Sequence, residues 1–389
     1  MVTPKLRFKE FNRIWSKYDI SEVTEYLVDG THFSPKSTDG EFKYITSKNI
    51  RNDGLDLSNI SYISRDEHNA IYKRCKVQLG DILLTKDGAN TGNCCLNTLD
   101  EEFSLLSSVA VLRGKKKSFD NNFILQILQS DVGQSTITSS MAGQAITRIT
   151  LAKIKGYAFK FPEFEEQTKI ASFLSTVDEK ISQLNQKHEL LSQYKQGMMQ
   201  KLFSQQICFK ADDGSEFEEW ENLYIGDLCK ITTGNKDTQN KVNNGAYPFF
   251  VRSQTVEQIN SYSMDCEAVL TSGDGVGVGK NYHYINGKFD FHQRVYCLYN
   301  FSEIVLGKYL YIYFSSFFYD RVKRLSAKNS VDSVRMDMIS KMQIQLPCLE
   351  EQIKISNFFS AIDQKIEVVA QQIEQAKQWK KGLLQQMFV

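Results

Sequence analysis

One segment of this chain occurs twice. Residues 161–203 and 346–388 align without a gap at a spacing of 185 residues, and 18 of the 43 aligned positions are identical. Both copies begin with a proline that is followed by Glu-Glu-Gln and then by Lys-Ile. An internal repeat of this length constrains the fold more than any other feature of the sequence, because it predicts two related units in tandem.

Each copy of the repeat carries an apolar stripe that advances by four and three residues in turn. This heptad pattern, with polar residues between, is typical of a coiled-coil seam. A core helix of a globular domain is the alternative, but the length and the polar outer face favour the coiled coil. The seam residues are Ile170, Leu174, Val177, Ile181, Leu184, Leu191 and Met198 in the first copy, and Ile355, Phe359, Ile362, Ile366, Val369, Ile373 and Leu383 in the second.

The two predicted helices are expected to pair in antiparallel fashion. A parallel register would set Lys195 beside Lys380, and these like charges would repel each other. An antiparallel register places Lys195 near Ile362 instead and relates the two units by a pseudo-two-fold axis.

The rest of the chain predicts a mixed α/β (α+β) fold. Short strand-like runs occur at residues 42–50, 81–86, 109–113, 247–252, 268–272 and 295–299, and helical runs at 121–130 and 306–323. We therefore expect a first globular domain at 1–160, a helical spacer at 161–205, a second globular domain at 206–345 and a second spacer at 346–389.

The two predicted domains also correspond outside the helices. Each begins with a tryptophan, Trp15 or Trp220, and each has an apolar strand that runs into a glycine-containing turn at residues 82–92 or 269–279. Between these positions the sequences diverge widely. A shared frame with unlike surfaces is typical of related domains that bind different ligands.

Composition indicates a protein without a membrane span or an export signal. No run of about 18 apolar residues occurs, and the first residues lack an apolar core, so a cytoplasmic location is expected. The eight cysteines are scattered without a Cys-x-x-Cys pair, and the five histidines show no metal-ligand spacing, so no metal site is expected. The net charge of +1 does not by itself indicate a nucleic-acid binder.

The sequence lacks the motifs of the enzyme classes that it superficially suggests. The glycine turn before Lys280 has Asp274 where a phosphate-binding loop needs glycine, and Asn281 stands where that loop has serine or threonine. The chain contains no Pro-Pro dipeptide, no Gly-x-Ser-x-Gly elbow and no convincing nuclease carboxylate cluster. We therefore predict that the chain is not an enzyme by itself and holds no cofactor.

The combined motifs resemble the specificity subunit of type I restriction–modification systems. The resemblance is carried by the repeated Pro-x-x-Glu-Glu-Gln-x-Lys-Ile opening, its Phe-x-x-x-x-Asp-x-Lys-Ile continuation, the tryptophan near the start of each half and the segments 45–50 and 80–83. It covers essentially the whole chain. It implies two target recognition domains that each read one half of a split DNA sequence, joined by two helices that fix the gap between the halves.

The resemblance also implies partners and their cofactors. Two methyltransferase subunits would dock on the helices and use S-adenosylmethionine, and separate motor–nuclease subunits would use ATP and Mg. The partner of the chain itself would be double-stranded DNA.

Base recognition requires cationic and amide side chains on loops that a rigid sheet supports. On this basis we expect DNA contacts from Lys36, Lys48, Lys86, Asn90, Gln144 and Arg148 in the first domain, and from Lys236, Arg252, Ser253, Gln254, Lys280 and Lys328 in the second. The competing hypothesis is a scaffold without DNA, in which a coiled coil presents two α/β interaction domains.

Overall fold

The computed structural model describes residues 4–37, 39–141, 148–275, 277–325 and 333–389. The chain divides into two compact units. Unit 1 comprises Met1–Lys187 and Val369–Val389, and unit 2 comprises His188–Val368. Helices α6 (Phe164–Phe203) and α10 (Leu349–Met387) each contribute one part to unit 1 and the other part to unit 2.

The globular part of unit 1 mixes short strands and helices. Its elements are β1 (Ser16–Asp19), α1 (Ile20–Val23), β2 (Thr24–Asp29), β3 (Phe42–Ile45), η1 (Ser47–Asn49), β4 (Ile50–Arg51), β5 (Gly54–Leu55), β6 (Ser61–Ile63), α2 (Arg65–Tyr72), β7 (Ile82–Thr85), β8 (Cys94–Leu96), β9 (Ser104–Leu105), β10 (Val109–Gly114), α3 (Asn121–Gln129), α4 (Asp131–Met141), α5 (Leu151–Lys155) and β11 (Ala158–Phe161).

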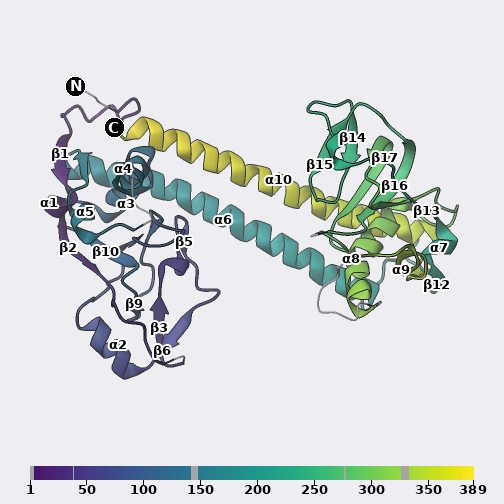
Figure 1. The fold of residues 1–389 in the computed structure, drawn as a ribbon, viewed down its shortest axis with the longest axis horizontal. Helices are drawn as coiled ribbons and strands as arrows, with labels where there is room; N and C mark the ends of the chain where they lie inside the picture. Colours follow the sequence, from purple (N-terminus) through teal and green to yellow (C-terminus); the bar gives the residue numbers. More distant parts are fainter. Residues whose placement is uncertain (1–3, 38, 142–147, 276, 326–332) are drawn as a thin grey trace. The chain divides into compact units, whose positions relative to one another are not determined.

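The central sheet of unit 1 has the order β2-β10-β7-β8 and is buried on both faces. Figure 1 labels two of its strands, β2 and β10. Successive strand residues point to opposite faces. In β10, Ala110 and Leu112 accordingly pack with α3 and α6 in one core, whereas Val109 and Val111 pack in a second core. Smaller sheets with the orders β6-β3-β9, β1-β11 and β4-β5 complete the unit.

The globular part of unit 2 has fewer and longer strands. Its elements are β12 (Glu221–Tyr224), α7 (Ile225–Leu228), β13 (Lys230–Thr233), η2 (Thr238–Asn240), β14 (Tyr247–Phe250), β15 (Val256–Ile259), β16 (Met264–Ser272), β17 (Tyr282–Phe291), β18 (Val295–Tyr299), α8 (Gly307–Leu325), α9 (Met336–Ser340) and β19 (Gln343–Leu346).

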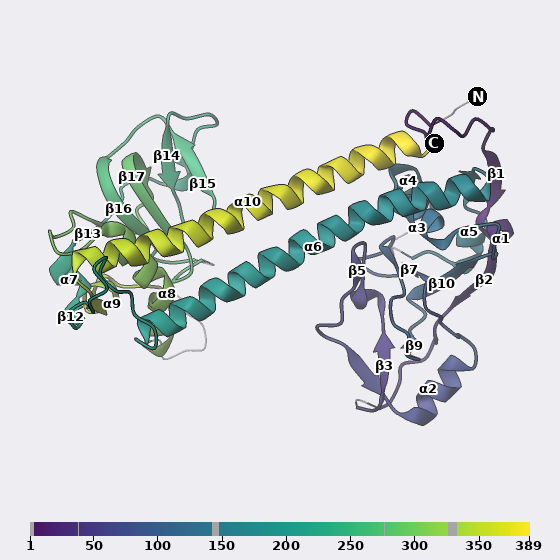
Figure 2. The same ribbon diagram turned by 180° about the vertical axis from the view of Figure 1, so that it is seen from behind.

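Unit 2 has one six-stranded sheet with the order β13-β18-β16-β17-β14-β15 (Figure 2). The equivalent strands of unit 1 belong to two separate sheets, β2-β10-β7-β8 and β6-β3-β9. In unit 1 the parallel partner of β3 is the short strand β9, which is separate from β8. In unit 2 the long strand β17 pairs with β16 and, at its end, with β14 in parallel. One continuous strand therefore occupies the place of β8 and β9.

The mixed α/β fold that the sequence predicts is confirmed, and most predicted elements are present. The predicted helix at 306–323 is α8 (Gly307–Leu325), and the strand at 295–299 is β18. The predicted strand at 42–50 is wrong in its second half. It ends at Ile45, because the Thr46 side chain accepts a hydrogen bond from the Lys48 backbone N–H and starts a 3-10 turn.

The predicted seam residues are buried or half-buried throughout. In unit 1 the first part of α6 and the last part of α10 contribute to a single core through residues such as Leu174 and Leu383. In unit 2 the last part of α6 and the first part of α10 do the same through Leu202 and Phe359. Leu191, Met198 and Ile366 are half-buried, and the remaining predicted seam residues are buried.

Candidate nucleic-acid interface

In unit 1, three segments next to strands and a fourth before the helix α5 are joined by backbone hydrogen bonds into a loop cluster. The Lys86 N–H, after β7, donates to the carbonyl of Ser108 at 2.7 Å, and the Ile149 N–H donates to the carbonyl of Lys86 at 2.8 Å. The Leu106 N–H donates to the carbonyl of Ile45 at 3.0 Å. The segments after β3 and β7, the segment before β10 and residues 148–149 therefore meet at one place.

Unit 2 repeats this cluster bond for bond. The Gly273 N–H donates to the carbonyl of Arg294 at 2.7 Å, and the Val334 N–H donates to the carbonyl of Gly273 at 2.7 Å. The His292 N–H donates to the carbonyl of Phe250 at 2.9 Å. These bonds make Ser108 and Arg294 equivalent positions, as they do Lys86 and Gly273.

Two glycines show how closely the backbones approach in both clusters. A Cβ atom on Gly30, after β2, would lie 2.0 Å from the carbonyl oxygen of Leu105. A Cβ atom on Gly234, after β13, would lie 2.0 Å from that of Phe291. No side chain fits at either position, so the shared frame depends on glycine there.

The predicted DNA contacts of the first domain are placed differently from one another. Lys36 and Lys48 are exposed, and Arg148 lies with its Nε 3.8 Å from a carboxylate oxygen of Asp87. The Asn90 amide donates to the carbonyl of Ser47 at 3.2 Å. Lys86 is buried, with its ammonium 2.7 Å from the Asp29 carboxylate, which places that charge inside the unit. Gln144 lies outside the described residues.

In unit 2, Arg252, Gln254 and Lys280 are exposed, and Lys236 and Ser253 are half-buried. The Lys280 ammonium lies over the ring of Tyr319, 5.0 Å from its centroid. The Lys236 ammonium is 3.9 Å from the buried Asp290 carboxylate. Lys328 lies outside the described residues.

Arg294 is a cationic residue of the unit 2 cluster that the sequence analysis did not predict as a DNA contact. Arg252 Nη1 and Arg294 Nη1 bind the two carboxylate oxygens of Asp274 at 3.1 and 3.0 Å. Both arginine side chains remain about half exposed, at 45% and 63%. Arg294 directly precedes β18. Its neighbours in the sequence do not indicate that it lies beside the turn that carries Asp274. The turn that carries Asp274 was predicted from its glycines, and Gly275 in this turn has φ +84°.

The buried His292 side chain holds the backbone of Arg294 in place. Its Nδ1 accepts a hydrogen bond from the Arg294 N–H at 2.9 Å. Burial lowers the pKa of His292, and the positive charge of Arg252 lowers it further. The imidazole is therefore neutral near pH 7, which is the state in which Nδ1 accepts that bond.

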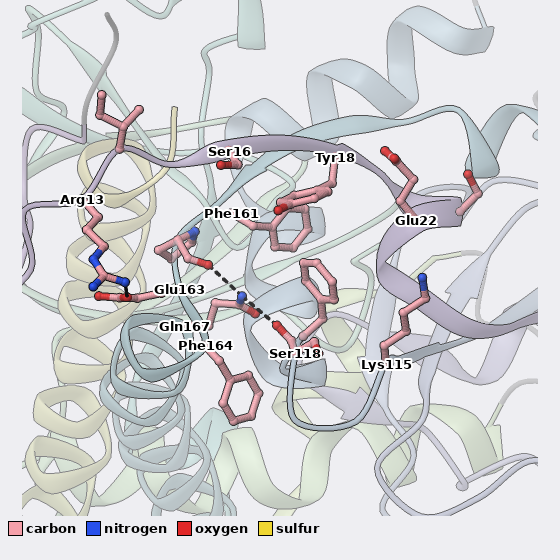
Figure 3. Close-up of a pocket in the computed structure, with 14 residues that line it drawn as sticks. Arg13, Ser16, Tyr18, Glu22, Lys115, Ser118, Phe161, Glu163, Phe164 and Gln167 are labelled. Atoms are coloured by element: carbon pink, nitrogen blue, oxygen red, sulfur yellow. Dashed lines mark hydrogen bonds and ion pairs between the residues drawn. The ribbon is translucent and has the colours of Figure 1, made fainter.

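The repeated Glu-Glu-Gln motif performs a structural task in both units. In unit 1, Gln167 donates to the carbonyls of Ser118 and Pro162 at 3.1 and 2.9 Å and accepts from the Asp120 N–H at 3.1 Å. These bonds tie the start of α6 to the loop before α3. Gln167, Ser118 and Pro162 also line a cavity of about 890 Å³. Arg13 Nη1 lies 2.7 Å from the Glu163 carboxylate there, and Figure 3 marks this ion pair.

The equivalent glutamine of unit 2 makes the same set of bonds. Gln352 donates to the carbonyls of Ile304 and Pro347 at 2.8 Å each and accepts from the Leu306 N–H at 2.8 Å. The motif therefore joins each long helix to its own globular part.

The second glutamate of each motif is buried against the tryptophan of its unit. Trp15 Nε1 donates to Glu166 at 3.4 Å, and Trp220 Nε1 donates to Glu351 at 2.8 Å. Glu166 is also paired with Arg7, whose Nε and Nη2 each lie 2.7 Å from a carboxylate oxygen. Burial raises the pKa of the Glu351 carboxyl, an effect that the hydrogen bonds from Trp220 and the Phe209 backbone partly offset.

The two long helices carry a reciprocal pair of salt bridges at repeat-equivalent positions. In unit 1, Asp178 of α6 binds Lys380 of α10 at 2.6 Å. In unit 2, Lys195 of α6 binds Asp363 of α10 at 2.5 Å. Asp178 and Asp363 are 185 residues apart, as are Lys195 and Lys380, so each copy of the repeat supplies the lysine in one unit and the aspartate in the other.

The described residues include neither a metal site nor a membrane-spanning helix. Within the ranges given above, no group of three or more His, Cys, Asp or Glu side chains has the geometry of a metal site. None of the helices described combines the length and the apolar character that a membrane crossing requires.

Comparison with known proteins identifies the family. The family model described as type I restriction modification DNA specificity domain matches residues 12–193 and 217–378, and the chain belongs to this family. Each half of the chain carries one match, as the internal repeat requires.

Relatives and solved structures agree with this assignment. The MjaVIII specificity subunit of Methanocaldococcus jannaschii is 26% identical over 378 residues, which cover 89% of this chain and 85% of the relative. The EcoDI specificity subunit of Escherichia coli is 29% identical over 163 residues, covering 41% and 35%. The S subunit of M. genitalium has a similar fold, with a TM-score of 0.69 at 16% identity over 100% of this chain and 99% of that one.

A second solved chain, from a study of complex assembly and conformational transition of the type I R-M system, has a TM-score of 0.53 at 16% identity and covers 96% of this chain and 97% of its own. The resemblance that the sequence motifs indicated is thus confirmed at the level of the family, and the fold of this chain is similar to that of a solved S subunit.

Proposed function

We propose that this chain is the DNA-recognition subunit of a type I restriction–modification complex and that each of its two loop clusters reads one block of a split DNA target. The observation that carries the proposal is the pair of clusters. Their backbone hydrogen bonds are the same, but the side chains on this frame differ, as in buried Ser108 and exposed Arg294. Two readers built on one frame suit two different short sequences that are separated by a gap of fixed length.

The helices α6 and α10 are proposed to pair as an antiparallel coiled coil. In unit 1, Trp15 contacts both Glu166 near the start of α6 and Phe388 after the end of α10, while Asp178, further along α6, binds the earlier Lys380 of α10. In unit 2, Phe203 at the end of α6 stacks with Phe359, and the earlier Lys195 binds the later Asp363. Each unit by itself therefore supports the antiparallel sense.

The catalytic steps are assigned to partners. Two methyltransferase subunits would dock on the helices and methylate adenine with S-adenosylmethionine, and motor–nuclease subunits would use ATP and Mg to move and cut DNA. Because phosphate neutralisation normally dominates affinity and this chain has a net charge of only +1, the methyltransferase subunits are expected to supply much of the basic surface around the DNA.

The test is a methylome. The chain is co-expressed with its cognate methyltransferase subunit in a host without other DNA methylation, and the genome is sequenced with detection of modified bases. The proposal predicts N6-methyladenine in one motif with two specified blocks and a fixed unspecified gap. An assembled complex that methylates no such motif would instead support the scaffold hypothesis.

A further inference from the structure

Unit 2 carries a pair of arginines whose positions are fixed before any DNA is bound. Arg252 follows β14 and Arg294 precedes β18, so the two residues come from different parts of the chain and converge on the single carboxylate of Asp274. We propose that Arg252 and Arg294 read guanine in the DNA block that unit 2 recognises, and that Asp274 is their positioning residue. This inference rests on the proposed function and names the base chemistry of one of its two sites.

The backbone of each arginine is held independently of the carboxylate. The Asn281 amide donates to the carbonyl of Arg252 at 3.0 Å. The carbonyl of Arg294 accepts from the Gly273 N–H at 2.7 Å, and its own N–H donates to His292 at 2.9 Å. An arginine that is fixed at both its backbone and one guanidinium nitrogen loses less conformational freedom on binding than a free surface arginine does.

The charge of the group favours a base over a phosphate. Two guanidinium groups around one carboxylate carry a net charge of about +1, and the partly exposed Asp274 would repel a phosphate that approached between them. The major-groove edge of guanine is neutral and offers two acceptors, O6 and N7, which match the paired donors of one guanidinium group. Each arginine uses Nη1 for Asp274, which leaves other donors on the exposed part of the group.

Unit 1 lacks this arrangement although its frame is the same. Ser47 and Ser108 stand at the positions of Arg252 and Arg294, and the Ser47 N–H donates to the Ser108 hydroxyl at 3.1 Å. The aspartate of the turn is kept as Asp87, but its cationic neighbour is Arg148, at the position of Ser333. The arginine pair is therefore a feature of one reader and not of the frame.

The first test compares methylomes of the complex with the cognate methyltransferase. Arg252→Lys and Arg294→Lys keep the positive charge but remove the paired donors, and Arg324→Lys, at an exposed position on α8, is the matched control. The expected result is that one or two guanine positions in a single block become degenerate while the other block and the gap are unchanged. Unchanged guanine positions in both variants, with wild type methylating a split motif, would overturn the inference alone, whereas no split motif in wild type would overturn the proposed function as well.

A second test does not depend on the folding of a variant. The wild-type complex is titrated with target duplexes in which single guanines are replaced by 7-deazaguanine, which lacks the N7 acceptor. A loss of roughly 10- to 100-fold in affinity is expected at the guanines that the arginines read. Full affinity for every substituted duplex would overturn the inference.

Asp274→Asn separates positioning from charge. Removing the carboxylate makes the net charge more positive by one unit, so affinity for unrelated DNA is expected to rise and to become more salt-dependent. Discrimination against the 7-deazaguanine duplex is expected to fall, because the guanidinium groups lose their anchor. If discrimination and salt dependence both stay at the wild-type level, Asp274 does not position the pair.

Discussion

The two loop clusters share their main chain and differ in their side chains. Two equivalent backbone bonds join Ser108, Lys86 and Ile149 in unit 1 and Arg294, Gly273 and Val334 in unit 2, and a third joins the segment before β10 or β18 to the end of β3 or β14. Around the aspartate of the turn, unit 1 places two serines and one arginine where unit 2 places two arginines and one serine. A frame made of backbone hydrogen bonds does not constrain the outward side chains, so the readers can diverge without loss of the fold.

The long helices show the opposite pattern. Their sequences are similar, with 18 of 43 aligned positions identical between the two copies. The Glu-Glu-Gln motif makes equivalent hydrogen bonds in both units. One difference surrounds the buried glutamate, where Glu166 has Arg7 as an ionic partner and Glu351 accepts hydrogen bonds from Trp220 and a backbone N–H. Three paired substitutions and one pH dependence test how far the equivalence of the two copies extends.

The largest effect is expected from a charge in the helix seam. Ile181 is 7% exposed in the unit 1 core, whereas its repeat equivalent Ile366 is only half-buried in unit 2. Ile181→Asp should therefore destabilise unit 1 by about 3–5 kcal/mol, and Ile366→Asp should cost unit 2 about half as much. Urea unfolding measures both, with Ile→Val at each position as the control. Equal small losses in the Asp and Val variants would contradict a buried seam.

The two buried glutamates should respond unequally to neutralisation. Glu166→Gln leaves the mostly buried Arg7 guanidinium without its counter-charge and is expected to cost about 2–4 kcal/mol. In Glu351→Gln the amide oxygen still accepts from Trp220, so the change in unfolding free energy is expected to stay within about 1 kcal/mol. Thermal and urea unfolding of both variants decide the matter. A loss in Glu351→Gln as large as that in Glu166→Gln would show that the ionic partner is not what separates the two sites.

The reciprocal salt bridges differ in exposure, and their energies should differ accordingly. Lys380 is 13% exposed and also donates to Gln129, whereas Lys195 is 28% exposed and its partner Asp363 is 46% exposed. Lys380→Ala should cost about 1–2 kcal/mol and Lys195→Ala less than about 1 kcal/mol. Unfolding at low and at high salt measures both, and only the Lys195 effect should vanish at high salt. A larger loss of stability in Lys195→Ala than in Lys380→Ala would mean that side-chain exposure does not determine the relative energies of the two salt bridges.

The smallest effect is the pH dependence that Glu351 contributes to the stability of unit 2. Because burial raises the pKa of the Glu351 carboxyl in the folded chain, the folded state takes up this proton at a higher pH than the unfolded state does. The stability of the wild type relative to Glu351→Gln should therefore rise as the pH falls through the folded-state pKa and should level off below the ordinary carboxyl pKa. A difference between the two proteins that is independent of pH, or one that falls with acidification, would contradict the assignment.

Periodic and repeated features were the most predictable from sequence. The heptad stripes predicted both long helices, because a stripe sustained over many turns has few alternative conformations. The strand β18 was predicted at its observed bounds. The resemblance carried by the repeated motif gave the family correctly, but the role of its second glutamate was not predicted, since its tryptophan partner lies 151 residues away in unit 1. The fact that Trp and Glu recur together in both halves was the signal that could have indicated their contact.

The side chains of the loop clusters were less predictable, because their environment depends on segments that are distant in sequence. Lys86 looked like an exposed turn lysine, yet it is buried against Asp29 of β2. Arg294 was missed because nothing near it in the chain marks it, and the pairing of β16 with β18 brings it to Asp274. Whether each predicted contact reads DNA stays a prediction.

The central claim is that each half reads its own block of the target, and a domain exchange tests it most directly. Residues 206–345 are replaced by the corresponding segment of a relative of different specificity, and the methylomes of the hybrid and wild-type complexes are compared. The account predicts that one block changes to that of the relative while the other block and the gap length are retained. A hybrid complex that assembles and methylates but changes both blocks, or neither, would contradict it.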